Sequence, residues 1–520
     1  LNLGLASNGP ARIDAGVLHT LQESEDEGHT HAERRELALK AADLLEADTK
    51  DVENRIDALM LEEELVTSKP DWLQNPVCAR AEETIVRCLH NQSKADSSLP
   101  PIQVEKAIEW AQEKAGFAFA DQQAEAVRQA LQSKISILTG GPGTGKTTIL
   151  RALVSILRAK KTKILLAAPT GRAARRMAES CSHFAQTVHR LLKFDPSQGG
   201  FTQNEQNPLI CDFVIMDEAS MLDLRLAAAL IRSLPPKAHL LLVGDADQLP
   251  SVGSGNGLKD LIQCELFQVT RLAVTFRQAE NSGIVGLAHG ILAGKGSPPP
   301  PVDSLSEINP QHDVHFVRAL TPEDCVSAVT RLSKDIIPRK FSIDPKNDLQ
   351  ILAPLHRGIG GIGNLNDQLR DALNPTGATQ VMGSLLFREG DKVIQTRNNY
   401  DKDVFNGDMG IIESVDTLNG KGDIDFEGKK VSYQRMEITD LQPAYAISVH
   451  KSQGSEYPVV IFPLLKQHFM MLQRNLVYTG LTRAKKKVIF VGDPAAYAMA
   501  IRNDKTLVRQ TDLIRKLKSR

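Results

Sequence analysis

The sequence predicts an α/β protein with two parallel-sheet units, a helical segment before them and a small antiparallel insert in the second unit. Three observations lead to this prediction. From about residue 102, apolar runs alternate with amphipathic helical stretches, as in parallel sheets covered by helices. Residues 1–98 show only the helical spacing of apolar residues. Residues 406–436 carry short runs separated by turn residues, which is typical of antiparallel strands.

The N-terminal segment, 1–98, is expected to be a small helical domain. Its helical stretches are AGVLHTLQESEDEG, RRELALKAADLLEA and DVENRIDALMLEEELV. They suggest a helix-turn-helix arrangement, but the segment is acidic, which favours a structural role over DNA binding. The stretch NQSKADSSLPP at 91–101 is expected to be a linker to the first unit.

The two parallel-sheet units are expected over 99–305 and 306–520. The proline-rich run at 294–304 suits neither a helix nor a central strand, so we place the boundary beside it. Strands are predicted near 135–139, 163–168, 211–216, 239–243, 268–270, 314–317, 349–353, 458–462 and 487–491. In the insert, DMGIIESVD, DIDF and KKVSY are predicted strands of a small barrel, with turns at Asn419-Gly420 and Glu427-Gly428.

The stretch ISILTGGPGTGKTT at 135–148 joins an apolar strand to a glycine-rich loop and a helix. It matches the pattern G-x-x-x-x-G-K-[ST], which is typical of a phosphate-binding loop. Glycines let backbone N–H groups face phosphate oxygens, Lys146 adds positive charge, and the Thr147 hydroxyl is a Mg²⁺ ligand. A turn without function is less favoured. The predicted ATP-binding residues here are Gly141, Pro142, Gly143, Thr144, Gly145, Lys146, Thr147 and Thr148.

A second segment, CDFVIMDEAS at 211–220, is an apolar strand that ends in two carboxylates. Asp217 is predicted to hold Mg²⁺, and Glu218 to orient and deprotonate the attacking water. An isolated acidic pair would favour a solvated loop, but a buried strand brings this pair to the sheet edge where ligands bind in α/β folds. The two segments together predict hydrolysis of a nucleoside triphosphate.

Other polar residues are candidates for the same site. Gln248 follows the strand LLLVGD and is predicted to sense the γ-phosphate or the attacking water. Gln123 precedes the first strand, and its amide is suited to the adenine edge. Two arginines are further candidates, Arg277 in VTFRQ and Arg483 in YTGLTRAKKK. For an isolated arginine, a surface salt bridge is the favoured interpretation. An arginine that reaches the γ-phosphate from the second unit would instead couple hydrolysis to domain motion.

Loop residues with hydroxyl, amide and basic groups are suited to sequence-independent contact with the phosphates of a single strand. The predicted DNA-binding residues are Pro169, Thr170, Arg172, Thr187, His189, His450 and Lys451. Neither histidine belongs to a cluster with the spacing of metal ligands. The stretch GIGGIG at 358–363 matches G-x-G-x-x-G, but Gly383 stands where a dinucleotide site needs an acid. A phosphate-binding loop for another ligand or a tight turn is favoured there.

Composition limits the class of protein. The net charge is −1, so any nucleic-acid binding must come from local basic surfaces. The six cysteines include no C-x-x-C pair, which is evidence against a zinc site or a disulfide framework and is consistent with a reducing cytosol. No apolar run reaches the roughly 18 residues that span a membrane, and we expect no signal peptide. The chain begins at Leu1 rather than Met, from which we expect that an upstream segment was removed.

In chain order, several segments resemble the motifs of superfamily 1 helicases, specifically the RecD-like family of DNA helicases. They are GGPGTGKTT, APTGRAA, MDEASML, GDADQLPSVG, FRQ, VHKSQGSE and YTGLTRAKK, and the resemblance covers roughly residues 100–500. DAGVLHTL, GHTHAERREL and ARAEETIVRCL also resemble the helical region of the stand-alone branch of the family. That branch generally carries further upstream helix-hairpin-helix elements, which this sequence lacks.

The resemblance implies two RecA-like domains, with ATP and Mg²⁺ between them, single-stranded DNA across their tops and 5′→3′ translocation. It also implies that a hairpin at 192–208 acts as a pin at the duplex fork, and that the barrel insert is the small accessory domain. Phe276 stands where some relatives stack a tyrosine on adenine, and the ring is kept. Glu456 in VHKSQGSE is also a predicted ATP-binding residue.

The leading prediction is an ATP-dependent helicase that unwinds DNA. The motifs alone do not separate DNA from RNA. An RNA helicase of the same superfamily and a DNA-bound ATPase switch that does not unwind stay open. The expected partners are single-stranded DNA, a duplex fork and repair or recombination proteins. We expect a monomer in the cytoplasm, associated with the nucleoid.

Overall fold

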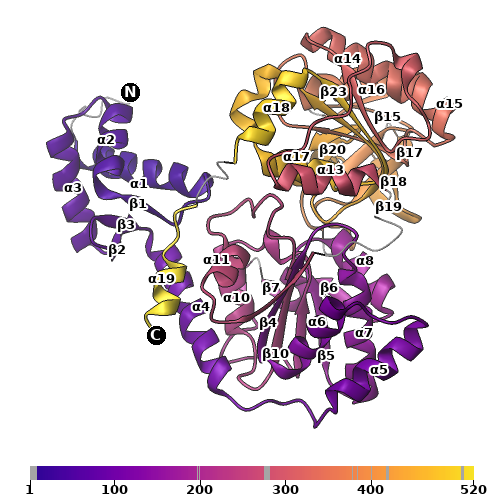
Figure 1. Cartoon of the computed structure of the whole chain (residues 1–520). Helices are drawn as coiled ribbons and strands as arrows, with labels where there is room; N and C mark the ends of the chain where they lie inside the picture. The colour runs from indigo at the N-terminus through magenta and orange to yellow at the C-terminus, as the bar shows by residue number, and fades with distance from the viewer. Residues whose placement is uncertain are drawn as a thin grey trace.

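The computed structural model describes residues 9–195, 197, 199–273, 282–376, 379–382, 385–399, 401–416, 421–504 and 509–520. Figure 1 shows two sheet-containing units, one above the other, with the N-terminal helices to one side. Within the described residues, no helix is long and apolar enough to cross a membrane.

The first unit is a six-stranded parallel sheet in the order β11-β4-β10-β9-β5-β6. Its strands are β4 (Ile135–Gly140), β5 (Ile164–Ala168), β6 (Ala185–Thr187), β9 (Phe213–Met216), β10 (His239–Gly244) and β11 (Gln268–Leu272). Five of them confirm the predicted strands, and β6 was missed. Helices cover both faces: α5 (Val104–Ala115), α6 (Asp121–Gln132), α7 (Lys146–Ala159), α8 (Gly171–Cys181), α9 (Val188–Leu191), α10 (Leu224–Arg232) and α11 (Gly257–Gln263).

The second unit is a five-stranded parallel sheet in the order β12-β23-β22-β13-β21. Its strands are β12 (Val314–Arg318), β13 (Leu349–Ala353), β21 (Ala446–Ser448), β22 (Tyr457–Leu464) and β23 (Ala484–Gly492). The four predicted strands are confirmed, and β21 was missed. Its helices are α13 (Gly283–Leu292), α14 (Pro322–Arg331), α15 (Ile337–Phe341), α16 (Ile362–Leu373), α17 (Arg474–Leu481) and α18 (Pro494–Arg502).

The helix α13 packs in the core of the second unit. Its buried residues Ile284, Ala288 and Ile291 share a cluster with Phe316 and Phe462. The proline-rich run that follows α13 therefore lies within the second unit. The sequence placed the boundary after this run because proline marks a break in secondary structure, but such a break need not separate two cores.

The insert is a five-stranded antiparallel sheet in the order β19-β18-β17-β16-β20. Its strands are β16 (Lys392–Gln395), β17 (Met409–Asp416), β18 (Lys421–Phe426), β19 (Lys429–Tyr433) and β20 (Leu441–Pro443). The three predicted strands are confirmed, and two more extend the sheet beyond 406–436. A separate hairpin, β14 (Thr379–Met382) and β15 (Leu385–Arg388), precedes it. Glu427 and Gly428 turn with positive φ, whereas Asn419 and Gly420 lie outside the described residues.

The N-terminal segment is helical as predicted but also contains a small sheet. Its core lies between α1 (Pro10–Asp26), α2 (Arg34–Leu45) and α3 (Thr49–Leu61). The missed strands are β1 (His31–Glu33), β2 (Val66–Lys69) and β3 (Trp72–Gln74), in the order β1-β3-β2. Strands of three or four residues are too short to show a period of two.

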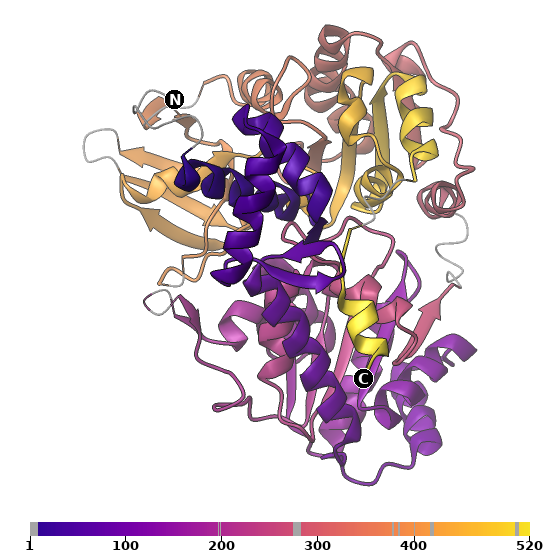
Figure 2. The ribbon, with the colours of Figure 1, turned by 90° about the vertical axis from the view of Figure 1, so that its left-hand side faces the viewer.

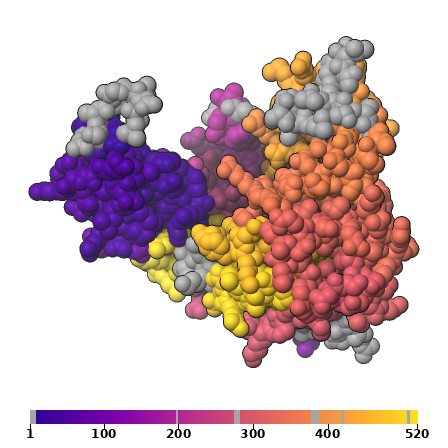
Figure 3. Space-filling model, turned by 90° about the horizontal axis from the view of Figure 1, so that it is seen from above, coloured from indigo at the N-terminus to yellow at the C-terminus, as the bar shows by residue number. Residues whose placement is uncertain are grey.

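The helix α4 (Pro76–Lys94) joins the N-terminal helices to the first unit, and its apolar face packs in the core of that unit beside α10. The C-terminal end of the chain also packs against α4. After α18, the helix α19 (Leu513–Lys518) packs against α4 and α11 (Figures 1 and 2). Seen from above, the C-terminal residues lie between the N-terminal helices and the second unit (Figure 3).

Candidate active site

The carboxyl ends of three central strands meet at one edge of the first sheet. Parallel pairing aligns Gly244 with Thr139 and Leu242 with Met216. The loops that follow β4, β9 and β10 therefore start side by side, as ligand-binding loops do in open α/β sheets. This register brings Lys146, Asp217, Glu218 and Gln248, which the sequence singled out separately, to the same edge.

The loop after β4 has the backbone shape of a phosphate cradle. Gly143 and Gly145 have φ of 72° and 85°, a region that side-chain-bearing residues rarely adopt. A Cβ atom on Gly141 would lie 2.9 Å from the hydroxyl of Tyr478, so glycine is needed there for space. The ammonium group of Lys146 donates hydrogen bonds to the carbonyls of Gly140 and Gly141. The loop thus fits a phosphate chain at the N-terminus of α7.

The two carboxylates follow β9. The Glu218 N–H donates to Oδ1 of Asp217 at 2.9 Å, and Glu218 has a positive φ of 51°. Burial raises the pKa of the Asp217 carboxyl, the neighbouring Glu218 raises it further, and Lys146 acts in the opposite direction. Asp217 and Thr147 carry oxygen atoms of the kind that Mg²⁺ binds. The described residues contain no group of three His, Cys, Asp or Glu that would hold a metal without a nucleotide.

The third loop links the two units. Gln248 donates through Nε2 to Oδ2 of Asp245 at 3.2 Å, and its buried Oε1 makes no hydrogen bond within the described chain. Tyr478, on α17 of the second unit, donates to the same Asp245 oxygen at 2.8 Å. Burial and the neighbouring Asp245 raise the pKa of Tyr478, so its hydroxyl keeps the proton that it donates.

Arg483 follows α17 and is buried in the second unit. Its guanidinium donates to the carbonyls of Thr479 at 3.3 Å and Ser455 at 3.2 Å. Thr479 in turn accepts a hydrogen bond from the N–H of Leu249, just after Gln248, at 2.9 Å. The arginine is therefore attached to the segment that contacts the first unit. Arg277 and Phe276 lie outside the described residues.

Two further candidates for nucleotide contact have partners in the structure. Gln123 is buried near the start of α6, where its Oε1 accepts from the N–H of Ala120 at 3.1 Å. Glu456 accepts from Arg176 on α8 at 2.7 Å and lies 3.4 Å from Lys485. The pair Arg176–Glu456 is thus a second contact between the two units.

The DNA candidates of the first unit lie after β5 and β6. Pro169 ends the β5 side of this loop, and Thr170 and Thr187 each accept a backbone N–H at the start of the next helix. Arg172 pairs with Glu427 of the insert at 3.1 Å and lies over the Tyr457 ring. Arg172 therefore faces the second unit and its insert.

His189, another of the DNA candidates, lies beside two aromatic rings. Its ring packs against Phe194 and Phe201, with centroids 6.1 and 5.7 Å away, and burial lowers its pKa. The two phenylalanines belong to β7 (Phe194–Asp195) and β8 (Gly200–Phe201), an antiparallel pair. The predicted hairpin strands are therefore confirmed, and His189 supports their base. Pro196 lies outside the described residues.

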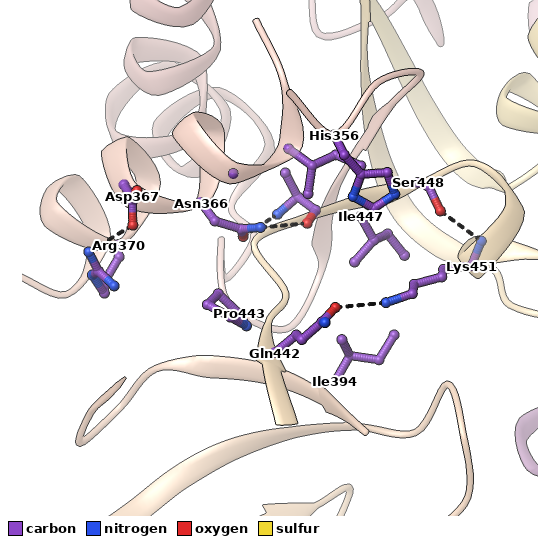
Figure 4. Close-up of a pocket in the computed structure, with 13 residues that line it drawn as sticks. His356, Asn366, Asp367, Arg370, Ile394, Gln442, Pro443, Ile447, Ser448 and Lys451 are labelled. Carbon is purple, nitrogen blue, oxygen red and sulfur yellow. Dashed lines mark hydrogen bonds and ion pairs between the residues drawn. The ribbon is translucent and has the colours of Figure 1, made fainter. Parts of the chain in front are cut away.

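The DNA candidates of the second unit line two cavities. Lys451 borders a cavity of about 350 Å³, together with His356 and Ser448, and Figure 4 shows these three side chains on one side of it. Lys451 donates to Gln442 at 2.9 Å, and burial lowers its pKa. His450 lines a different cavity of about 390 Å³, which also includes Gln248.

The GIGGIG stretch is a tight turn. It leads from β13 into α16, and three of its N–H groups bond to carbonyls of the same loop, which removes these three as donors to a phosphate. The N–H groups of Gly361, Ile362 and Gly363 donate to Gly358, Leu355 and His356 at 3.0, 2.9 and 3.2 Å. Of the two alternatives that the sequence left open, the structure supports the tight turn.

Known proteins match the chain over most of its length. Residues 123–254 match the AAA domain, 365–426 the ATP-dependent RecD-like DNA helicase SH3 domain, and 443–491 the UvrD-like helicase C-terminal domain. The RecBCD enzyme subunit RecD of Haemophilus influenzae is 31% identical, covering 76% of this chain and 72% of its own. That of Mycolicibacterium smegmatis is 30% identical, with 78% and 76% covered.

The chain belongs to the RecD-like family of helicases. The ATP-dependent RecD2 DNA helicase of Deinococcus radiodurans is 34% identical over 81% of this chain, and the chain spans 55%, about half, of that relative's length. Among solved structures, a Pif1 helicase from Candida albicans gives a TM-score of 0.45 at 18% identity, covering 78% of this chain and 99% of that one. A Bacteroides Pif1 helicase in complex with ADP-AlF3 and ssDNA gives 0.43 at 16%, with 71% and 92% covered.

Sequence reasoning missed several residues of this RecD-like site. Tyr478 lies in the segment YTGLTRAKK and Asp245 in GDADQLPSVG. In these two segments the sequence predicted roles only for the arginine and the glutamine. The hydrogen bond between Tyr478 and Asp245 joins residues 233 positions apart. Nothing in either segment alone indicates the partner, so only the packing of the two units identifies it.

Proposed function

We propose that the protein is an ATP-dependent DNA helicase that translocates 5′→3′ on single-stranded DNA and unwinds duplex DNA. The observation that carries this proposal is the position of α17. This helix of the second unit touches the phosphate-loop edge of the first through Tyr478, whose hydroxyl bonds to Asp245 and approaches Gly141. A nucleotide in the loop would therefore be bound at the junction of two RecA-like units, where hydrolysis moves one against the other.

The chemical roles follow from the side chains at this edge. Lys146 exchanges its loop carbonyls for the β- and γ-phosphates, and Glu218 orients and deprotonates the attacking water. Mg²⁺ held by Thr147 and Asp217 would neutralise charge on the same phosphates. Arg483 supplies positive charge from the second unit after leaving the carbonyls of Thr479 and Ser455. Gln248, whose buried Oε1 has no hydrogen-bond partner among the described residues, reports on the γ-phosphate.

The DNA path is proposed to run across both units, over Thr170, Arg172 and Thr187 in the first and His450 and Lys451 in the second. We assign the first motor domain to the β4–β11 sheet with α4, the second to the β12–β23 sheet with α13, and the accessory domain to β16–β20. One relative is named a DNA helicase, and residues 365–426 match a domain of RecD-like DNA helicases, which supports DNA over RNA. A monomer in the cytoplasm that acts in repair or recombination is consistent with this assignment.

The direct test uses matched duplexes with a single-stranded 5′ or 3′ tail. We expect ATP-dependent unwinding of the 5′-tailed duplex only, and none by the Lys146→Ala variant. Equal unwinding from both tails would contradict the polarity. Stimulation of ATP hydrolysis by a ribose strand but not by the deoxyribose strand would identify an RNA helicase. DNA-stimulated hydrolysis without strand separation would identify a non-unwinding switch.

The hairpin at 192–208 is proposed to separate the strands. Its strands β7 and β8 are two residues each, and the paired residues Phe194 and Phe201 pack ring against ring. We therefore expect the hairpin to act as a steric obstacle and not as a catalytic group. Replacing 194–207 by a short Gly/Ser linker should sharply reduce duplex unwinding while single-strand-stimulated ATPase activity survives. If the shortened protein unwinds as well as the parent, strand separation happens elsewhere.

A further inference from the structure

One side chain of the C-terminal tail holds the loop that follows Gln248. Nη1 of Arg509 donates to the carbonyls of Gly253 at 2.9 Å and Gly255 at 2.6 Å and to Oγ of Ser251 at 3.1 Å. Nη2 donates to the carbonyl of Ser251 at 2.6 Å. One guanidinium thus binds four oxygen atoms of a single loop, an arrangement that only the planar fork of arginine provides.

The same loop is held on its other side by the second unit. The N–H of Leu249 donates to Thr479, and the carbonyl of Leu249 accepts from Gln453 at 2.7 Å. Leu249 directly follows Gln248, and Arg509 lines the same cavity of about 390 Å³ as Gln248. The segment that carries the predicted sensor is therefore fixed between α17 and the tail.

The tail is itself attached to two other parts of the molecule. The backbone of Gln510 bonds to the N-terminal domain: its carbonyl accepts from the N–H of Thr30 at 2.8 Å, and its N–H donates to Nδ1 of His29 at 3.0 Å. The backbone N–H of Asp512 and the ammonium group of Lys516 donate to Glu82, a fully buried carboxylate of α4, at 3.1 and 2.8 Å. Arg509 is thus held in place on its C-terminal side.

The N-terminal domain leaves room for this contact. A Cβ atom on Gly28 would lie 2.2 Å from Nε of Arg509, and Gly28 has a φ of +99°, so only glycine fits beside the guanidinium. The carbonyl of Gly28 also accepts from the N–H of Gly255 at 2.9 Å. Residues from the N-terminal domain, the tail and the sensor loop therefore meet at one point.

We propose that Arg509 is a positioning residue for ATP hydrolysis, which holds the Ser251–Gly255 loop so that Gln248 and Leu249 keep their places against the second unit. This inference rests on the proposed function, because it concerns the DNA-stimulated step. Loss of the Arg509 side chain should lower turnover and leave nucleotide affinity unchanged. Arg509 binds the Ser251–Gly255 loop, and the groups of the phosphate loop that bind nucleotide stay in place.

The test compares three variants of the full chain: Arg509→Ala, Arg509→Lys and, as a control, Arg515→Ala. Arg515 lies on the same tail but contacts Asp512 and the carbonyl of Ser68, away from the sensor loop. The kcat and the KM for ATP are measured with a saturating single-stranded DNA oligonucleotide, together with the thermal midpoint of each variant.

We expect kcat to fall by about 10- to 100-fold in Arg509→Ala, as for a small misplacement of a catalytic group, with KM for ATP unchanged. Arg509→Lys should be intermediate, because lysine restores the charge but not the fork. Arg515→Ala should keep its kcat within about twofold, since it leaves the loop contacts intact.

A kcat in Arg509→Ala equal to that of Arg515→Ala would overturn the proposal and leave Arg509 as a structural contact only. A raised KM with unchanged kcat would also overturn it. If Arg509→Ala does not fold, Arg509→Lys decides, and parental turnover in that variant contradicts the proposal. A parent chain without any DNA-stimulated hydrolysis would instead refute the proposed function.

Discussion

Each of the two sheets has a strand that leads through a glycine-rich loop into a helix, but only one of these loops is built for phosphate. In the first unit, the N–H groups of Gly141, Gly143 and Gly145 donate no hydrogen bond within the described residues. In the second unit, the N–H groups of Gly361, Ile362 and Gly363 are all bonded to carbonyls of their own loop. The glycine pattern is similar, and the hydrogen bonding is opposite.

The difference shows that glycine spacing alone does not define a phosphate site. A ligand needs N–H groups that the loop does not use itself, together with a positive charge such as Lys146. In its GIGGIG turn, the second unit uses the N–H groups of Gly361, Ile362 and Gly363 itself and has no lysine directly after the glycines. Its contribution to the nucleotide site comes instead from α17 and the residues after it, which approach the first loop from across the junction.

The largest expected effect follows from removing the charge of the first loop. Lys146→Ala should lower ATP hydrolysis by about 10³-fold or more, because Lys146 is the one cationic side chain of the loop GGPGTGKTT itself. Steady-state phosphate release measures it. The control is Lys163→Ala, an exposed lysine just before β5 at the opposite edge of the sheet, which should retain parental activity. Parental turnover in Lys146→Ala would show that the phosphates bind elsewhere.

Matched substitutions in the two loops sharpen the comparison. Gly145→Ala forces a side chain into a φ of 85°, which costs roughly 1–2 kcal/mol and should weaken ATP binding by about 10-fold. Gly363→Ala places a Cβ atom 3.7 Å from the carbonyl of His356, an ordinary contact at the start of a helix. We expect unchanged ATP affinity there, measured with a fluorescent ATP analogue. Equal losses in both variants would mean that the loops do not differ in role.

A smaller effect is expected from the hydroxyl that joins the units. Tyr478→Phe removes one of the hydrogen bonds to the buried Asp245 carboxylate, which keeps that of Gln248, and should cost about 1–3 kcal/mol of stability. The control is Tyr497→Phe, because the buried hydroxyl of Tyr497 makes no hydrogen bond in the described part of the chain. Chemical denaturation of both variants measures the difference. A loss in Tyr497→Phe as large as that in Tyr478→Phe would contradict the assigned contact.

The sequence was sufficient for the features that depend on local pattern. Apolar runs of five or six residues predicted the central strands, and the P-loop and Asp217-Glu218 pair predicted the edge where nucleotide binds. It was not sufficient for β6 and β21, which are three residues long, or for the membership of α13 in the second core. Periodicity identifies a helix but not the surface against which it packs.

Contacts between distant residues were also beyond the sequence. The side chains of Arg509 and Glu82 join segments that are hundreds of positions apart, and no local pattern indicates either partner. His189 was assigned to DNA because of its residue type and loop, whereas its place is set by the rings of Phe194 and Phe201. The sequence does not predict the surroundings of a side chain when residues of another helix or strand form them.

The central claim is that nucleotide held by the first sheet is hydrolysed with help from the second. Arg483→Ala tests it most directly, with ATP affinity and DNA-stimulated kcat measured on the same preparation. The account predicts an ATP Kd within about twofold of the parent and a kcat lower by about 10³-fold, as on loss of an arginine that stabilises transition-state charge. Parental turnover, or a loss of affinity as large as the loss of turnover, would contradict it.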